Sequence, residues 1–261
     1  WLDDEAIQDW YESATPSSRG RPQRYSDLAI TTVLVIKRVF RLTLRAAQGF
    51  IDSIFTLMNV PLRCPDYTSV SKRAKSVNVS FKTSTRGEIA HLVIDSTGLK
   101  VFGEGEWKVK KHGKERRRIW RKLHLAVDSN THEIICADLS LNNVTDSEAF
   151  PGLIRQTHRK IRAASADGAY DTRLCHDELR RKKISALIPP RKGAGYWPGE
   201  YADRNRAVAN QRMTGSNARW KWTTDYNRRS IAETAMYRVK QLFGGSLTLR
   251  DYDGQVAEAM A

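Results

Sequence analysis

Four polar residues near the C-terminal end of the sequence are spaced to share one side of a helix. Tyr226, Arg229, Glu233 and Lys240 are separated by 3, 4 and 7 positions, steps that return to the same face of an α-helix. A carboxylate held between a phenol, a guanidinium and an ammonium suits a metal ion next to a phosphate group. Taken alone, the stripe could equally be a solvated basic helix face with an incidental salt bridge.

Two upstream aspartates follow stretches that read as β-strands. Asp95 ends the β-branched run 91–95, and Asp167 directly follows the run 161–166. If Glu233 joins them, three carboxylates repel one another, and burying them unpaired costs several kcal/mol. Divalent cations relieve that repulsion, and ligands that are all oxygen favour Mg²⁺ or Mn²⁺. Both aspartates, like Asp171, could instead be ordinary turn residues, but Asp167 is preferred to Asp171 because it comes straight after the strand.

The order of elements after residue 88 predicts how these acids are positioned. We expect three strands, a helix, a strand, a helix, a strand and then the helix with the polar stripe. The strands are expected at 91–95, 119–127, 133–141, 161–166 and 184–188. This order is typical of an RNase H-like α/β fold, a mixed five-stranded sheet flanked by helices, in which the first and fourth strands are neighbours. Asp95 and Asp167 should then emerge side by side.

The remaining segments divide the chain. Residues 1–85 read as all-helical, with helices expected at 3–13, 27–39, 46–58 and 66–74. The last is basic, which suggests a helix-turn-helix-like DNA-binding region, although it could be a helical cap that only packs on the next domain. Residues 86–261 would form the catalytic domain. Within it, about 191–224 is rich in Gly, Arg and Trp without a clear period, so we expect a basic insertion that is either a loop or partly ordered.

Composition points to a polyanionic partner. The chain carries 44 Lys and Arg against 29 Asp and Glu, a net charge of +15, which favours nucleic acid. A membrane surface would need a basic amphipathic helix with a fully apolar opposite face, and none is evident, so no membrane association is expected. The three cysteines, Cys64, Cys136 and Cys175, are scattered and form no CxxC pair. They argue against a zinc ribbon and fit a reducing cytoplasm.

One short segment concentrates the positive charge. Between residues 108 and 122 there are nine Lys or Arg against one acid, Glu115. The segment would connect the first two strands beside the acidic residues, where tracking of DNA phosphates is plausible, and the alternative is a solvated charged hairpin. The candidate DNA-binding residues are Lys108, Lys110, Lys111, Arg116, Arg117, Arg118, Arg121 and Lys122.

Several motifs together resemble a known family. The spacing of Tyr226, Arg229, Glu233 and Lys240 resembles the YREK signature of bacterial DDE insertion-sequence transposases. Two segments are similar to those that carry the first and second aspartates of that family, and two others look like the N-terminal region of its IS-five group, within the IS-four-like superfamily. In order along the chain these four segments are 20–27, 65–71, 93–98 and 166–171.

The resemblance implies a fold, an activity and a set of partners. Asp95, Asp167 and Glu233 would be the catalytic, metal-binding triad, with two Mg²⁺ (or Mn²⁺) ions, and Tyr226, Arg229 and Lys240 would hold phosphates of the transposon ends. The enzyme would cut double-stranded DNA at terminal inverted repeats and join the 3′ ends to target DNA by phosphoryl transfer. It would act as a homodimer or larger oligomer, in the bacterial cytoplasm at the nucleoid. The alternatives are an RNase H-like nuclease and a non-catalytic DNA-binding protein derived from a transposase.

Overall fold

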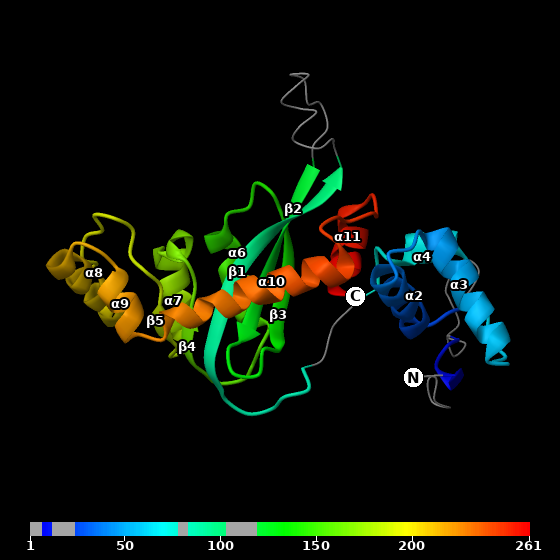
Figure 1. The fold of residues 1–261 in the computed structure, drawn as a ribbon, viewed down its shortest axis with the longest axis horizontal. Coiled ribbons are helices and arrows are strands. Elements are labelled where there is room, and N and C mark those ends of the chain that lie inside the picture. The colour runs from blue at the N-terminus through cyan, green and yellow to red at the C-terminus, as the bar shows by residue number, and fades with distance from the viewer. Residues whose placement is uncertain (1–6, 12–23, 78–82, 103–118) are drawn as a thin grey trace, which may run out of the picture. The chain divides into compact units, whose positions relative to one another are not determined.

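Five strands form one mixed β-sheet with the order β3-β2-β1-β4-β5 (Figure 1). Strands β1, β2 and β3 pair antiparallel, whereas β4 runs parallel to β1 and β5 runs parallel to β4. Their bounds are Ile89–Phe102 (β1), Ile119–Asp128 (β2), Ile134–Leu141 (β3), Ile161–Ser165 (β4) and Ser185–Leu187 (β5). The expected RNase H-like sheet is confirmed, including the adjacency of the first and fourth strands.

The computed structural model describes residues 7–11, 24–77, 83–102 and 119–261. Contacts within the chain define two units, one of residues 1–81 with 242–261 and one of residues 82–241. The sheet lies in the second unit, and each unit is described separately below. None of the helices in the described ranges combines the length and the apolar character needed to cross a bilayer.

Helices flank the sheet. Phe150 and Leu153 of α6 and Leu179 of α7 lie in one buried cluster with Leu92 and Ile94 of β1, and Figure 1 shows α10 running across the strands. A capping box at Thr145 and Glu148 starts α6. The helices of this unit are α6 (Asp146–Arg155), α7 (Arg173–Arg181), α8 (Ala202–Thr214), α9 (Ala218–Thr223) and α10 (Ser230–Phe243), whose last two residues fall in the other unit.

Three expectations for this unit were wrong in whole or in part. The segment 191–224 is not a loop, because α8 and α9 occupy much of it. Strand β1 does not end at Asp95, since pairing with β2 carries it on to Phe102. Tyr226 and Arg229 precede the α-helix that was expected to carry them, in a 3₁₀ turn, η2 (Tyr226–Arg229). Tertiary partners set each of these boundaries, so the local period did not reveal them.

The helical unit contains α2 (Asp27–Val39), α3 (Leu44–Leu57), α4 (Tyr67–Arg73) and α11 (Tyr252–Met260). Side chains of Ser26, Thr43 and Asp66 cap the first three helices by accepting hydrogen bonds from backbone N–H groups, as their types predict. Leu249 and Ala257 belong to the same core as these helices. Residues 242–261 therefore group with the N-terminal helices, whereas the sequence division placed them with the sheet.

A buried ion pair joins α11 to α2. Lys37 donates hydrogen bonds to Glu258 and, at 2.6 Å, to the hydroxyl of Thr248, and its side chain is 3% exposed while that of Glu258 is fully buried. Burial by itself would raise the pKa of Glu258, but the charge of Lys37 and the hydrogen bonds from Lys37, Leu249 N and Thr248 hold it below its usual value. Both charges are therefore compensated inside the core.

Replacing Glu258 by Gln should destabilise the helical unit by about 3–5 kcal/mol at pH 7, because Lys37 would be left charged and buried. Since the folded pKa of Glu258 is lowered, its contribution is present above the unfolded value of about 4.3 and is lost as pH falls through the folded value. Denaturant titration at pH 7 and at pH 3 measures both effects. The exposed pair between Lys75 and Asp251 gives a matched control, and Asp251→Asn should cost no more than about 1 kcal/mol. Equal losses for the two variants would contradict this account.

Candidate functional site

The parallel pairing of β1 with β4 places two aspartates next to each other. The last paired positions are Val93 and Ser165. Two residues further along each strand stand Asp95 and Asp167, at matching positions just beyond the end of β4. Strand β1 continues past this point with β2 as its partner, so Asp95 lies on an ordered strand and Asp167 on the turn that leaves the sheet.

Asp95 is a poorly solvated carboxylate with two fixed contacts. Its side chain is 18% exposed, Oδ1 accepts a hydrogen bond from Ser96 N at 2.8 Å, and Oδ2 accepts one from Arg229 Nη1 at 3.1 Å. Burial raises the pKa of Asp95, and the charges of Asp167 and Glu233 raise it further, while Ser96 N and Arg229 oppose the shift. The three carboxylates are thus close enough to affect one another.

Asp167 begins a short 3₁₀ turn, η1 (Gly168–Tyr170), and its Oδ1 accepts a hydrogen bond from Ala169 N at 2.8 Å. The turn is anchored by Tyr170, which is 1% exposed and packs against Phe150 with ring centroids 5.6 Å apart. The carboxylate is therefore held by the backbone that carries it, at the edge of the sheet core.

Arg229 connects Asp95 to Glu233. Its Nη1 bonds to Asp95 on β1, and its Nη2 donates to Glu233 Oε1 one turn further along the chain. One guanidinium thereby holds carboxylates from a strand and from α10. Glu233 is 54% exposed, so it is the most accessible member of this acidic cluster, which consists of Asp95, Asp167 and Glu233.

The acidic cluster is not arranged around a metal position. Within the described ranges, no group of three His, Cys, Asp or Glu side chains could hold a metal ion together. The chemistry of the donors nevertheless fits a hard divalent cation, since all three are carboxylates and two are fixed side by side. The Arg229 guanidinium bridges two of the three acids, Asp95 and Glu233.

Tyr226 and Lys240 stand at different distances from the acids. Tyr226 is 6% exposed and packs against Trp220 with ring centroids 5.5 Å apart. Burial raises the pKa of Tyr226, with contributions from Asp167 and Asp95, so its phenol stays protonated and able to donate. Lys240 is seven residues beyond Glu233 on α10, about 10 Å along the helix axis. None of the hydrogen bonds described for the acidic cluster involves Lys240.

Comparisons with known proteins agree with these observations. Two family models, both described as Transposase DDE domain, match residues 1–104 and residues 86–261. The second match spans well over half of the chain. The chain belongs to the DDE transposase family. DDE transposase domains in general use divalent metal ions, which agrees with the all-carboxylate cluster.

Two solved transposase structures are similar to this chain at low identity. One is a cryo-EM structure of the piggyBac transposase synaptic complex with hairpin DNA, with 12% identity and a TM-score of 0.37 over 98% of this chain and 70% of that one. The other is the Drosophila P element transposase strand transfer complex, with 11% identity and a TM-score of 0.33 over 66% of this chain and 42% of that one.

The basic residues expected to contact DNA are only partly described in this transposase. Arg121 and Lys122 lie on β2, and Lys122 Nζ donates to Val144 O at 2.9 Å and to Asp146 at 3.3 Å. Lys122 therefore anchors the start of α6 as well as carrying charge. The other six candidates, Lys108, Lys110, Lys111, Arg116, Arg117 and Arg118, lie outside the described residues.

Sequence reasoning missed a buried cluster around Asp171. Arg204 of α8 donates to both oxygens of Asp171, at 2.7 and 3.2 Å, with the two side chains 3% and 2% exposed. His176 Nε2 lies 3.3 Å from Asp171 Oδ1, and the Arg204 guanidinium lies 3.6 Å from the centroid of the Trp197 ring. Asp171 therefore ties the insertion to α7, and no local signal could have revealed it because its partner is 33 positions away.

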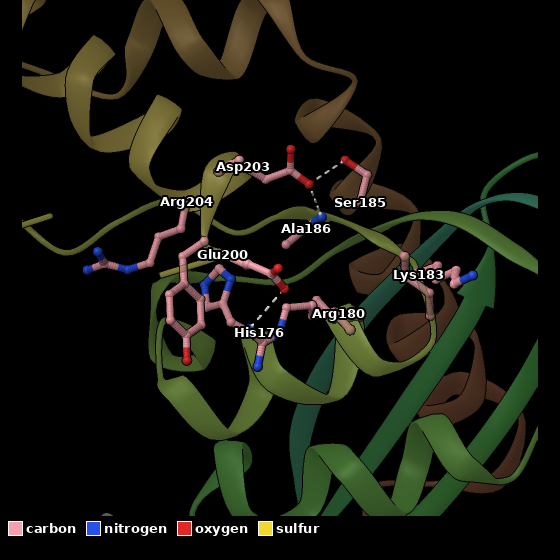
Figure 2. A pocket seen from close by; sticks show the side chains of 12 residues that line it. His176, Arg180, Lys183, Ser185, Ala186, Glu200, Asp203 and Arg204 are labelled. Atoms are coloured by element: carbon pink, nitrogen blue, oxygen red, sulfur yellow. Dashed lines mark hydrogen bonds and ion pairs between the residues drawn. The ribbon is translucent and has the colours of Figure 1, made fainter. Parts of the chain in front are cut away.

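A cavity of about 410 Å³ lies on the same side of the domain (Figure 2). Figure 2 shows Asp203 accepting hydrogen bonds from the Ser185 hydroxyl, at 2.8 Å, and from Ala186 N, at 3.1 Å. Ser185 and Ala186 belong to β5, at the edge of the sheet. Asp203 thus provides a hydrogen-bond acceptor for a backbone N–H group of the edge strand. Together with the contact between Asp171 and Arg204, it attaches the insertion to the sheet domain.

Asp171→Asn should destabilise the fold strongly, whereas Asp167→Asn should leave its stability almost unchanged. Loss of the Asp171 charge leaves Arg204 buried and unpaired, at a cost of about 3–5 kcal/mol. An asparagine at Asp167 keeps the oxygen that accepts from Ala169 N, so its change should stay within about 0.5 kcal/mol. Denaturant unfolding of the two variants measures this. A larger loss for Asp167→Asn would show that the roles of the two aspartates are reversed.

The raised pKa of Asp95 predicts that this residue lowers the stability of the fold. Below about pH 3.9 the carboxyl is protonated in both the folded and the unfolded chain. Above that pH the unfolded chain releases the proton first, so the free energy of unfolding of the wild type falls as pH rises toward the folded pKa. Asp95→Asn removes this effect and should melt at a higher temperature than the wild type at pH 7, with no advantage at pH 3. A variant less stable than the wild type at pH 7 would mean that the bond to Arg229 outweighs burial.

Proposed function

We propose that this protein is the transposase of a bacterial insertion sequence of the IS-five group. It cuts double-stranded DNA at the terminal inverted repeats of the element and joins the freed 3′ ends to target DNA. Asp95, Asp167 and Glu233 are the catalytic carboxylates. The observation that carries the proposal is the convergence of these acids from β1, the end of β4 and α10, with Arg229 bonded to two of them.

The acidic cluster would hold two divalent cations, Mg²⁺ or Mn²⁺. Such ions would acidify water and stabilise charge on the attacking and leaving oxygens of phosphoryl transfer. Asp95 and Asp167 supply ligands whose positions are fixed by the sheet, and Glu233 supplies a more exposed ligand from α10. Poor solvation of Asp95 strengthens its interaction with a cation, because that interaction replaces the missing water.

The remaining YREK positions have roles in positioning DNA. Arg229 presents a planar fork that matches a phosphate, and Lys240 presents a point charge further along α10. Tyr226 stays protonated and buried at the base of η2, where it can donate a hydrogen bond to a phosphate oxygen and support the turn that carries Arg229. After the first cut, the freed 3′-OH attacks a target phosphate, which exchanges one phosphodiester for another and needs no ATP.

The helical unit is proposed to bind DNA as well. Within the basic run of α4, Arg73 is engaged internally, with Asp27 and with Tyr25 O. Lys72 is exposed, and Lys75 forms only an exposed pair with Asp251, so these two lysines are the better candidates for phosphate contacts. Two element ends must be joined to one target, which supports action as a homodimer or larger oligomer at the bacterial nucleoid.

Single replacements of the acids should abolish cleavage and leave DNA binding intact. Asp95→Asn, Asp167→Asn and Glu233→Gln should each lower the cleavage rate by about 10²–10³-fold or more, because each removes a ligand of the cations that would stabilise the transition state. Incubation with Mg²⁺ and a duplex that carries the candidate terminal repeat measures cleavage and joining, and a gel shift measures binding. Asp225→Asn is the control, since this exposed acid pairs with Arg228 outside the cluster.

The outcomes of that experiment separate the candidate functions. Cleavage followed by joining supports a transposase. Cleavage without joining would make the protein an RNase H-like nuclease. If the wild type binds DNA but does not cleave it, the protein is a non-catalytic DNA-binding protein. If all three acid variants cleave DNA at the rate of the wild type, the assignment of the acidic cluster is refuted.

A further inference from the structure

The position of Arg229 suggests a role beyond holding a phosphate. Its side chain is 22% exposed, and both of its terminal nitrogens are occupied by acids of the cluster, Asp95 and Glu233. Asp95 Oδ1 already accepts from Ser96 N. Oδ2 of Asp95 is bonded to Arg229, so a cation held by both oxygens of this carboxylate would have to share Oδ2 with the guanidinium.

A guanidinium and a divalent cation cannot both occupy this place. Both bind the same carboxylate oxygens, and two positive groups on one oxygen repel each other in a poorly solvated site. Arg229 also balances the cluster electrically, so its presence lowers the attraction that the acids exert on a cation. A DNA phosphate offers the same guanidinium an alternative partner of matching geometry.

We propose that Arg229 is an internal counterion that keeps the acidic cluster closed to divalent cations until a DNA phosphate displaces the acids from its guanidinium. This inference rests on the proposed function. When a DNA phosphate binds the guanidinium, Asp95 and Glu233 lose their counterion, and a divalent cation can then neutralise their charge. Metal and DNA bind with positive coupling through one side chain, and by linkage each increases the affinity for the other. Arg229 is a positioning residue in this scheme.

The neighbouring arginine offers a matched control. Arg228 Nη1 donates to Asn130 Oδ1 at 2.7 Å, and its Nε lies 3.8 Å from Asp225. Arg228 carries the same charge one residue away, and none of the contacts described for it involves the acidic cluster. Arg229→Gln and Arg228→Gln therefore change the net charge equally, and only the first removes the bridge.

Isothermal titration calorimetry of the whole chain with Mn²⁺, in the absence of DNA, tests the proposal. Arg229→Gln should bind Mn²⁺ about 10-fold more tightly than the wild type, and Arg228→Gln should stay within about 2-fold. A saturating DNA duplex, with a titration of the duplex alone as reference, should tighten Mn²⁺ binding by the wild type about 10-fold and leave that of Arg229→Gln nearly unchanged. Circular dichroism melting verifies that each variant is folded.

Failure of the inference and failure of the proposed function give different results. If Asp95→Asn loses Mn²⁺ binding but Arg229→Gln binds no more tightly than Arg228→Gln, the acids bind metal and Arg229 does not compete, so only the inference is overturned. If Asp95→Asn binds Mn²⁺ as the wild type does, the cluster is not the metal site and both proposals fail. Arg229→Lys, which keeps the charge without the fork, should give an intermediate affinity, and an affinity equal to that of Arg229→Gln would show that the fork and not the charge blocks the cation.

Discussion

The parallel hydrogen-bond ladder between β1 and β4 is the constraint on which the site depends. It ends at Val93 and Ser165, and the chain places a carboxylate two residues later on both strands. Parallel strands in register carry equivalent positions out of the sheet together, so Asp95 and Asp167 must be neighbours whatever their charges prefer. Arg229 is attached at this point, and the pKa of Asp95 is raised there by burial, with the neighbouring charge of Asp167 adding to the shift.

The pKa values of three acids that lose solvent on folding, Asp95, Asp171 and Glu258, shift in different directions. The direction distinguishes acids in structural ion pairs from the acid at the candidate site. Asp171 and Glu258 are each met by a buried base, Arg204 and Lys37, and the pKa of both acids is held below its usual value. Asp95 also has an arginine, yet its pKa is raised, because burial outweighs that contact and the like charges of Asp167 and Glu233 add to the shift. The ion pairs of Asp171 with Arg204 and of Glu258 with Lys37 are buried and hold elements of the fold together. Asp95 has unsatisfied demand for positive charge, which is the property of a functional site.

The sequence predicted those features whose causes are local. Alternation and cap residues located the strands and helices, and the element order implied the sheet, because connections in such folds are few. It could not predict how α8 is attached to the rest of the domain, since the contact of Arg204 with Asp171 joins positions 33 apart. Nor could it predict that residues 242–261 join the helical unit, because Glu258 finds Lys37 across 221 positions. The candidate residues of the site could be named from their types and spacing, whereas the bridge made by Arg229 depends on three-dimensional contacts.

The choice of arginine at position 229 has a physical explanation. A lysine ammonium is a compact point charge, whereas a guanidinium presents separate donors in a rigid plane. Arg229 gives a donor from one terminal nitrogen to Asp95 on a strand and a donor from the other, in the same plane, to Glu233 on α10. The same two donors match two oxygens of one phosphate. A single side chain can therefore exchange carboxylates for a phosphate without changing its hydrogen-bonding pattern, and the +15 charge of the chain ensures that a phosphate backbone is attracted close enough for the exchange to occur.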